Sequence, residues 1–233
     1  MKVLVSGKNS EDLEPLVKQL GFEIVSENPE AVISYGGDGT LLASERQYPS
    51  IPKLPIRNDA VAKKCEDHQS KDLLKKLLQG KLDLTEYRKL ETIIEGKKLL
   101  ALNDFVIRNK DAIHSIRFRT PPDEKLIIGD GVVISTPYGS SGYFQSITGQ
   151  TFDSGFGLAF NNTTEKLEPQ FFNEEDQISF KLSRGQAALT SDNAPDIYLI
   201  PEGMEISFKL SDQTAKIYEL NSLRCPNCKV TRG

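Results

Sequence analysis

One short run constrains this chain more than any other: Ile33-Ser34-Tyr35-Gly36-Gly37-Asp38-Gly39-Thr40-Leu41-Leu42. Apolar and β-branched residues lead into three glycines around one aspartate, and a helix-competent segment, 40–48, follows directly. The pattern predicts a strand, a tight glycine turn and a helix N-terminus, which together favour a phosphate close to bare backbone N–H groups. Because the carboxylate of Asp38 would repel that anion, we expect it to meet a metal ion or a substrate hydroxyl. The alternative is an ordinary turn with Asp38 as the helix N-cap.

The composition is that of a globular protein with one large or two small domains. The chain has 233 residues, of which 27% are charged and 38% hydrophobic. Its net charge of −4 argues against generic nucleic-acid binding. No apolar run approaches the ~20 residues of a membrane span, so we expect neither a membrane segment nor a signal peptide. Three cysteines, an odd number, indicate a reducing compartment and predict a cytoplasmic protein.

Short strands alternate with a helix in the first part of the chain. Strands are expected at 2–6, 22–25 and 31–35, and the first helix is expected to begin after Asp12 as its N-cap. This order predicts an α/β N-terminal domain with a parallel, Rossmann-like sheet, whose ligands bind at the carboxyl ends of the strands. The glycine turn lies at such an end.

The character of the sequence changes near residue 84. A long strand at 84–94 and a hairpin turn at 95–98 lead into a partner strand at 99–108, and the later apolar segments are mostly strand-like. We therefore predict a β-rich C-terminal domain. The boundaries assigned from the sequence are an α/β nucleotide-binding domain at 1–84, a β-rich substrate-binding domain at 85–220 and a C-terminal tail at 221–233.

Two further segments are unusually polar. Asn103-Asp104 interrupts the strand expected at 99–108, although both residue types are depleted in strands. A bulge or strand end would explain the pair, and so would recognition of a base edge and a sugar diol. The segment 129–143 reads as a strand followed by a hydroxyl-rich turn, with a helix expected at 143–148. Such a turn either offers donors to a polar ligand or caps the helix.

Three motifs in order resemble those of NAD kinases. Residues 36–40 read like the GGDGT motif that this family shares with diacylglycerol and sphingosine kinases and with a bacterial phosphofructokinase relative. Asn103-Asp104 stands in the place of the family's Asn-Glu or Asn-Asp pair. The third segment looks like DGxxxSTPTGSTAYxxSxGG, a motif that lipid kinases lack. This chain keeps Asp130-Gly131, Ser135-Thr136-Pro137, Gly139-Ser140, Tyr143, Ser146 and Gly149.

The resemblance implies an enzyme that phosphorylates the adenosine ribose 2′-hydroxyl of NAD to give NADP, with ATP or polyphosphate as donor. It implies that Asp38 takes the hydroxyl proton, that Mg²⁺ or another divalent cation accompanies the donor, and that the subunits form homodimers or homotetramers with shared sites. The donor phosphates would lie near Gly36, Gly37, Gly39 and Thr40. The NAD-binding residues would be Asn103 and Ser141 at the adenine, Asp104 at the ribose, Gly142, Tyr143 and Ser146 along the pocket, and Asp130 at the nicotinamide half.

The chain also departs from this family. Family members carry Gly-x-Asn-x-Gly-x-x-Gly-Phe-Leu after the first motif, whereas the stretch 55–64 retains only Asn58 of it. The run 190–193 resembles a later Ser-x-Asp-Gly motif, with asparagine in place of the glycine. The basic residues that could bind donor phosphate instead, or simply be solvated, are Arg57, Lys63 and Lys64. Two alternatives stay open: a related kinase acting on another hydroxylated substrate, and a weakly active sensor that binds a dinucleotide.

The cysteines and histidines do not form a recognisable metal-binding pattern. Cys225 and Cys228 form a single CxxC pair, and Cys65 is the other cysteine. Because a structural zinc site needs four ligands, we expect a loose tail with two reduced thiols, or two pairs pooled between chains. His68 and His114 have no partner at ligand spacing and are expected to be surface or structural residues. We therefore predict no metal ligand in the chain.

Overall fold

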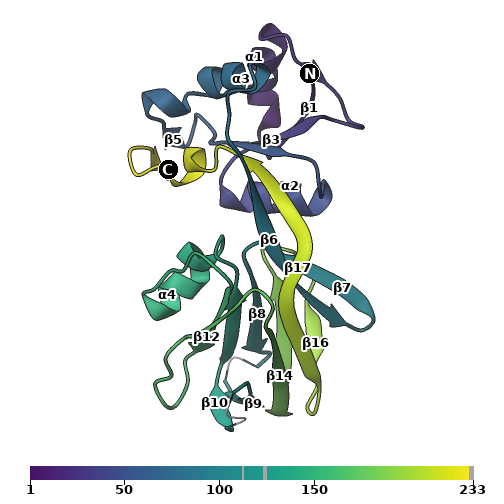
Figure 1. Ribbon diagram of the computed structural model, residues 1–233, viewed down its shortest axis with the longest axis vertical. Coiled ribbons are helices and arrows are strands. Elements are labelled where there is room, and N and C mark those ends of the chain that lie inside the picture. Colours follow the sequence, from purple (N-terminus) through teal and green to yellow (C-terminus); the bar gives the residue numbers. More distant parts are fainter. Residues whose placement is uncertain (112, 123–124, 231–233) are drawn as a thin grey trace. The chain divides into compact units, whose positions relative to one another are not determined.

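A parallel sheet organises the N-terminal part of the chain, as the alternation of strands and helix predicts. In the computed structural model, which describes residues 1–111, 113–122 and 125–230, its strand order is β2-β1-β3-β4. Figure 1 labels the two central strands, β1 and β3. These strands are β1 (Lys2–Ser6), β2 (Glu23–Ile24), β3 (Ala31–Tyr35) and β4 (Lys53–Ile56). The end of β17 (Glu205–Tyr218) extends the sheet, because Ile217 pairs in parallel with Lys53.

The helices around this sheet include α1 (Glu14–Gln19), α2 (Asp38–Gln47) and α3 (Ser70–Leu78). Apolar residues of α1 and α3, such as Val17 and Leu73, share one buried cluster with Val3 and Ile33 of the strands. The expected N-cap role of Asp12 is wrong, because Asp12 ends a separate 3-10 turn, Ser10–Asp12, and Leu13 precedes α1.

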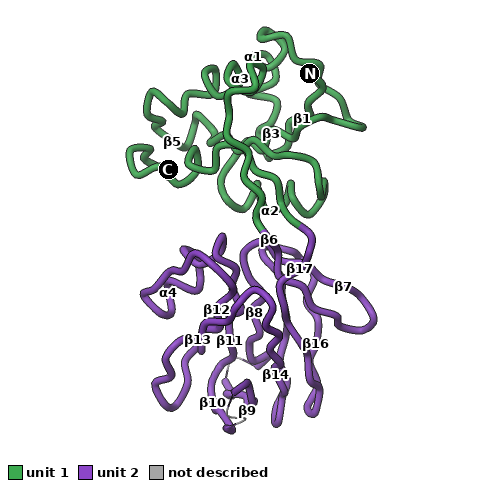
Figure 2. The backbone as a smooth tube through the Cα atoms, in the orientation of Figure 1, with its two compact units in different colours: residues 1–87, 214–233 green, residues 88–213 purple. Residues whose placement is uncertain are grey.

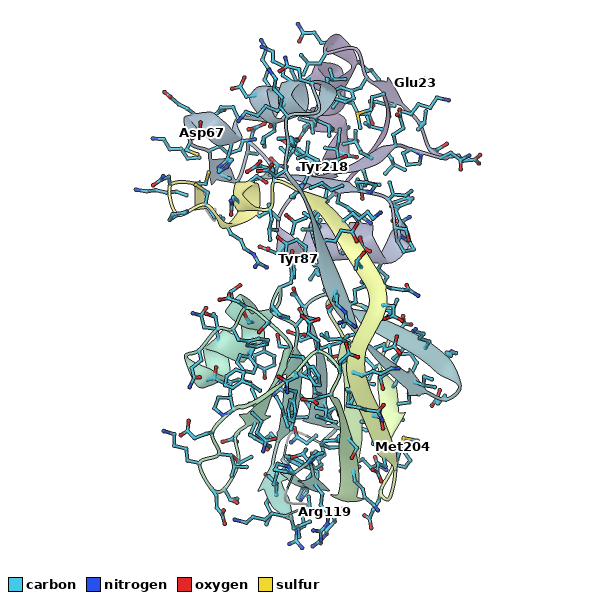
Figure 3. The ribbon with its side chains drawn as sticks, viewed as in Figure 1. Glu23, Asp67, Tyr87, Arg119, Met204 and Tyr218 are labelled. Atoms are coloured by element: carbon cyan, nitrogen blue, oxygen red, sulfur yellow. The ribbon has the colours of Figure 1, made fainter. Side chains whose placement is uncertain are left out.

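The chain folds into two compact units, shown in different colours in Figure 2. Unit 1 comprises residues 1–87 and 214–233, and unit 2 comprises residues 88–213. The chain passes from one unit to the other within β6 (Leu84–Ile94) and within β17. Figure 3 labels Tyr87, the last residue of unit 1 in β6, and Tyr218, the last residue of β17. The sequence placed 214–220 in the second domain and 221–233 in a separate tail. The structure assigns both stretches to unit 1, because β17 returns to pair with β4.

Unit 2 is β-rich, as predicted. One sheet contains β10-β9-β14-β17, and the other has the order β13-β12-β11-β8-β15-β16. Their members, besides β17, are β8 (Asp104–Asn109), β9 (Ile116–Arg119), β10 (Ile127–Gly129), β11 (Gly131–Ser135), β12 (Phe156–Asn161), β13 (Gln170–Phe172), β14 (Gln177–Arg184), β15 (Ala187–Ser191) and β16 (Tyr198–Ile200). A single apolar core takes residues from both sheets, including Phe105 and Phe208, whose ring centroids are 5.4 Å apart.

A change of sheet splits the single strand predicted at 99–108. β7 (Lys97–Ala101) pairs with β6, whereas β8 pairs with β11 and β15 in the other sheet. Leu102 and Asn103 make the crossing, so a strand end does account for the polar pair Asn103-Asp104. Because Asp104 pairs with Ser135, the crossing lies beside the end of β11.

The C-terminal segment also differs from the loose tail expected. It forms α5 (Asn221–Arg224) and β18 (Lys229–Val230), which pairs with β5 (Ala62–Lys63). None of the helices in the described residues is long and apolar enough to cross a membrane.

Candidate active site

The glycine turn has the strand–turn–helix form that its sequence predicts. β3 ends at Tyr35, and α2 begins after Gly36 and Gly37. A Cβ atom on Gly36 would lie 2.2 Å from Thr40 Oγ1, so only glycine lets Thr40 close over the turn. A Cβ atom on Gly37 would meet no described atom within 4 Å, so packing inside the chain does not account for this second glycine.

Asp38 is the exposed first residue of α2. The N-cap is Gly37, whose carbonyl accepts the N–H of Thr40 at 3.0 Å and of Leu41 at 3.2 Å. The alternative that made Asp38 the cap is therefore wrong. A carboxylate in the first turn still interacts favourably with the helix dipole, and here it is also accessible to a ligand from solvent.

Buried polar contacts hold α2 in place in unit 1. Ser44 Oγ lies 3.2 Å from Ser6 Oγ and 3.3 Å from Ser34 Oγ, which ties the helix to β1 and β3. Glu45 and Lys53 form an ion pair that is almost fully buried. A buried, hydrogen-bonded network of this kind fixes one helix position, so the turn carrying Asp38 is rigidly supported.

The stretch that departs from the family pattern folds back on itself. Asn58 Oδ1 accepts a backbone N–H two residues further on at 2.7 Å, which closes a local turn. Lys64, whose side chain is 2% exposed, pairs with Asp59 at 2.5 Å and donates to the Arg57 carbonyl at 3.0 Å. The guanidinium of Arg57 donates to a backbone carbonyl of α5. Of the three phosphate-binding candidates, Arg57 and Lys64 are thus engaged in the fold, and Lys63 is exposed.

In unit 2, one carboxylate shapes the segment that carries Asn103. Asp192 accepts the backbone N–H groups of Leu102 at 2.9 Å, of Asn103 at 2.7 Å and of Asp104 at 3.2 Å. Its own N–H donates to the Asp104 carbonyl at 2.9 Å. The run containing Asp192 was noticed in the sequence only as a motif, without a role. The structure makes it the residue that holds the turn between β7 and β8.

The turn after β11 holds the same segment from its other side. Thr136 donates its N–H to the Asn103 carbonyl at 2.9 Å and its hydroxyl to the Leu102 carbonyl at 2.6 Å. A Cβ atom on Gly139 would lie 2.3 Å from the Asn103 carbonyl oxygen, so a side chain there would drive the two segments apart. The second and third motifs therefore meet at Asn103.

The side chain of Asn103 has a hydrogen-bond acceptor that is available to a ligand. Its Oδ1 atom is buried, and no described residue donates a hydrogen bond to it. An unpaired buried acceptor costs about 1–3 kcal/mol, so such atoms are rare without a function. Ser141 is exposed and follows Gly139 by two residues, which places it within about 7 Å of that contact along the chain.

Asp104 lies next to Asn103 and is 7% exposed. Burial, and then the nearby charge of Asp192, raises the pKa of Asp104 from 3.8 to about 7. Burial also raises the pKa of Asp192, against the three N–H bonds that lower it. A ligand that donates hydrogen bonds to Asp104, such as a sugar diol, would offset part of the cost of its buried charge.

The remaining residues of the third motif have mixed roles. Ser140–Phe144 form a π-type turn broken at Gly142, and α4 (Gln145–Thr148) follows, close to the helix expected at 143–148. Gly142 is exposed, whereas Tyr143 packs against the small apolar cluster under this turn. The Ser146 hydroxyl donates to the Tyr143 carbonyl at 2.8 Å and serves the helix.

Asp130 lies apart from this group. It precedes β11, whereas Asn103 lies beside the other end of that strand. The five residues of β11 correspond to roughly 16 Å at the usual rise of a strand. Asp130 accepts hydrogen bonds from Ser115 at 3.2 Å and Asn162 at 2.7 Å, so it has local partners that the sequence did not predict.

The structure brings together four residues that the sequence left apart. Cys65, His68, Cys225 and Cys228 each offer a ligand atom, and these atoms all lie within 4.8 Å of one another. The expectation that His68 has no partner is therefore wrong. The signal was present in the sequence as a second short pair, Cys65-x-x-His68, but its link to the CxxC pair depends on the fold.

Comparisons with known proteins agree with the three motifs. No protein-family model matches the chain. An NAD kinase of Saccharolobus islandicus is 28% identical over 156 residues, 64% of this chain and 63% of that protein. An NAD kinase of Sulfurisphaera tokodaii is 29% identical over 159 residues, with the same shares. The match thus spans less than two thirds of the length of these relatives.

Solved structures resemble nearly the whole chain. An NAD kinase from Archaeoglobus fulgidus in complex with ATP has a TM-score of 0.77 at 19% identity, covering 96% of each chain. A yeast NADH kinase complexed with NADH has a TM-score of 0.79 at 14% identity, covering 95% of this chain and 84% of that one. These likenesses confirm the fold, and with the sequence relatives they confirm the resemblance to the NAD kinase family.

Proposed function

We propose that this protein is an NAD kinase, which transfers a phosphoryl group from ATP or polyphosphate to the adenosine ribose 2′-hydroxyl of NAD. The observation that supports this most directly is the buried Oδ1 atom of Asn103, which accepts no hydrogen bond from the described residues. Adenine presents an amino donor beside the N7 acceptor, and an asparagine amide matches both. Ser141, two residues after the Gly139 that packs on the Asn103 backbone, would complete the contact with the base.

Asp104 would accept hydrogen bonds from the ribose hydroxyls. It is adjacent to Asn103 and its carboxyl is buried, so base and sugar would be read by neighbouring residues. The rigid turn set by Asp192 and Thr136 would keep both side chains oriented before NAD binds, which lowers the entropy cost of binding.

Asp38 would act as the general base that takes the proton of the 2′-hydroxyl. It is exposed at the N-terminus of α2, where the helix charge also favours donor phosphates near Gly36, Gly37, Gly39 and Thr40. Mg²⁺ would neutralise the charge of these phosphates. In the described residues, the one grouping of three or more ligating side chains is the Cys/His cluster, which does not suit Mg²⁺, so we assign Mg²⁺ to the donor phosphates rather than to a protein cage.

A coupled assay for NADP formation tests the proposal. The full chain would be given NAD with ATP·Mg²⁺ and, separately, with polyphosphate, and the product would be detected with an NADP-specific dehydrogenase. We expect turnover with at least one donor and its loss in Asp38→Asn. Binding of NAD without turnover on either donor would contradict the kinase.

A dinucleotide-binding sensor is the second candidate, and one observation favours it. The stretch 57–64 is closed by its own hydrogen bonds and by the Lys64–Asp59 ion pair. At the corresponding place, NAD kinases carry a glycine-rich segment. Calorimetry separates the two functions, because a sensor would bind NAD but give no NADP. A related kinase would instead consume ATP with a different hydroxylated acceptor.

Assembly is part of the proposal. We infer a homodimer or homotetramer, because the resemblance to NAD kinases implies sites shared between subunits, with Asp130, at the far end of β11 from Asn103, contributed to the nicotinamide half. The odd number of cysteines supports a reducing compartment, the cytoplasm.

A further inference from the structure

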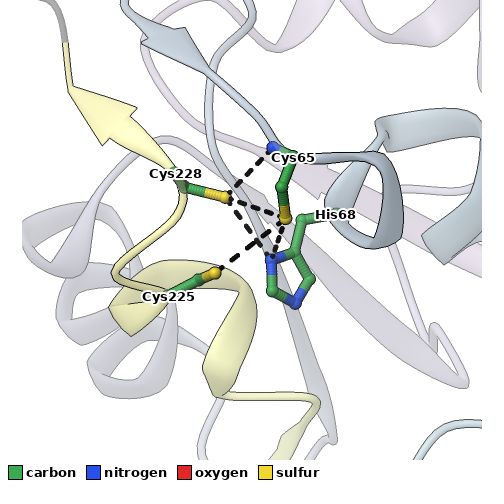
Figure 4. Close-up of side chains that lie close together, drawn as sticks. All are labelled: Cys65, His68, Cys225 and Cys228. Atoms are coloured by element: carbon green, nitrogen blue, oxygen red, sulfur yellow. Dashed lines mark hydrogen bonds between the residues drawn. The ribbon is translucent and has the colours of Figure 1, made fainter.

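Four sulfur and nitrogen atoms converge in unit 1, as Figure 4 shows. Cys65 Sγ lies 3.5 Å from Cys228 Sγ and 3.9 Å from Cys225 Sγ. His68 Nδ1 lies 3.2 Å from Cys65 Sγ and 3.4 Å from Cys228 Sγ. His68 is buried, at 9% exposure, the three cysteines are partly buried, and none of the four has a place in the proposed kinase chemistry.

These distances fit one tetrahedral metal ion. Zinc bonds of about 2.3 Å to sulfur and about 2.0–2.1 Å to nitrogen place two sulfur ligands about 3.8 Å apart, and a sulfur and a nitrogen about 3.5 Å apart. Four of the six separations are 3.2 to 3.9 Å, within a few tenths of an ångström of these values, and all six are within 4.8 Å. A disulfide does not describe the cluster, because its sulfur atoms would be about 2.0 Å apart and the third thiol would be left over.

The fold builds the site from two short ligand pairs. Cys65 precedes the 3-10 turn Glu66–His68 and His68 ends it, where the His68 N–H donates to the Cys65 carbonyl at 3.2 Å. Cys225 and Cys228 form a matching turn, closed by a 3.2 Å bond from the Cys228 N–H to the Cys225 carbonyl. The antiparallel pair β5–β18 joins the two turns, since β5 ends just before Cys65 and β18 begins just after Cys228.

The charges of two lysines beside the cluster also favour a metal ion bound by thiolates. Lys63 and Lys229 lie directly opposite each other in the β5–β18 pair, an arrangement that is unfavourable for two like charges. Three thiolates and one divalent ion carry a net charge of −1, which would offset the repulsion. The N–H of Cys65 also lies 3.4 Å from Cys228 Sγ, in position to donate to a thiolate.

We propose that Cys65, His68, Cys225 and Cys228 bind one structural Zn²⁺ ion in a closed Cys₃His site. Four protein ligands leave no open position for substrate, so the ion has no catalytic role. It fastens the C-terminal segment 221–230 to the stretch 57–68. The stretch 57–68 overlaps residues 55–64, which depart from the NAD kinase pattern, so the ion would cross-link this part of the chain to the C-terminal segment.

Metal analysis of the full chain tests the site. Protein expressed with zinc and purified under reducing conditions should contain about one Zn²⁺ per chain, and cobalt replacing it should give the visible absorption of a tetrahedral thiolate site. His68→Ala and Cys228→Ser should lose most of the metal to a competing chelator, whereas His68→Cys should retain it with an altered cobalt spectrum. His114→Ala, which removes an exposed histidine of unit 2, is the matched control and should keep its zinc.

Cobalt titration of the wild-type chain needs no variant, so the test does not depend on how well a substituted chain folds. A reduced wild-type chain that neither carries zinc nor takes up cobalt would overturn the site, as would metal content unchanged in both His68→Ala and Cys228→Ser. These readouts are independent of NADP formation, so failure of the kinase proposal would leave them intact.

Discussion

Asp104→Asn should change the pH dependence of stability in a direction set by the burial of this carboxyl. Burial and Asp192 raise the pKa of Asp104 from 3.8 to about 7 in the folded chain. In the unfolded chain the carboxyl returns to its ordinary value. Between these two values the folded chain holds a proton that the unfolded chain has released. The free energy of unfolding therefore falls as the pH rises through this window, and it levels off above about pH 7.

The size of this change in unfolding free energy follows from the shift in the pKa of Asp104. A shift of roughly three pH units corresponds to about 4 kcal/mol over the whole window. Between about pH 5.5 and about pH 8, linkage assigns about 2 kcal/mol of this loss to Asp104. Asparagine has nearly the same shape but does not titrate, so the variant lacks this contribution. The difference in unfolding free energy, wild type minus Asp104→Asn, should thus fall by about 2 kcal/mol across that range.

Urea unfolding followed by circular dichroism at a series of pH values measures this difference. The exposed Asp212→Asn, in the same unit, controls for the loss of a carboxylate. A wild-type minus Asp104→Asn difference that stays constant from pH 5.5 to pH 8 would refute the reasoning, because Asp104 would then titrate as an ordinary aspartate.

Four further predictions concern the candidate site. Asp38→Asn should lower turnover by about 10²–10⁴ while NAD affinity is preserved; near wild-type turnover in the coupled assay would remove Asp38 as the base. Asn103→Ala should weaken NAD binding by about 1–3 kcal/mol, and unchanged affinity by calorimetry would exclude it from the pocket. Gly139→Ala should reduce the unfolding free energy by about 1–3 kcal/mol, because its Cβ would press on the Asn103 carbonyl; an unchanged urea midpoint would contradict that contact. Mixed Asp38→Asn and Asp130→Ala subunits should regain part of the activity, and no recovery despite proven subunit exchange would confine Asp130 to its own chain.

Local signals in the sequence determined much of the fold. The glycine turn was predictable because glycine frees the backbone and the apolar period changes from strand to helix within a few residues. The order of an α/β part and a β-rich part followed from the spacing of apolar residues along the chain. The three motifs were identified in the sequence by their resemblance to those of NAD kinases, and the roles of their residues stay predictions.

Tertiary structure alone decided what those residues contact. The change of sheet at Leu102 and Asn103 could not be predicted from the sequence. The alternation of apolar and polar residues shows which face of a strand is buried, but not which strand it pairs with. The support from Asp192 depends on a contact with Asn103 across 89 positions. Cys65 and Cys228 lie 163 positions apart, and only the return of β17 to unit 1 brings them together. Spacing along a chain carries no information about such distant pairs, because sheet pairing and the packing of the core select them.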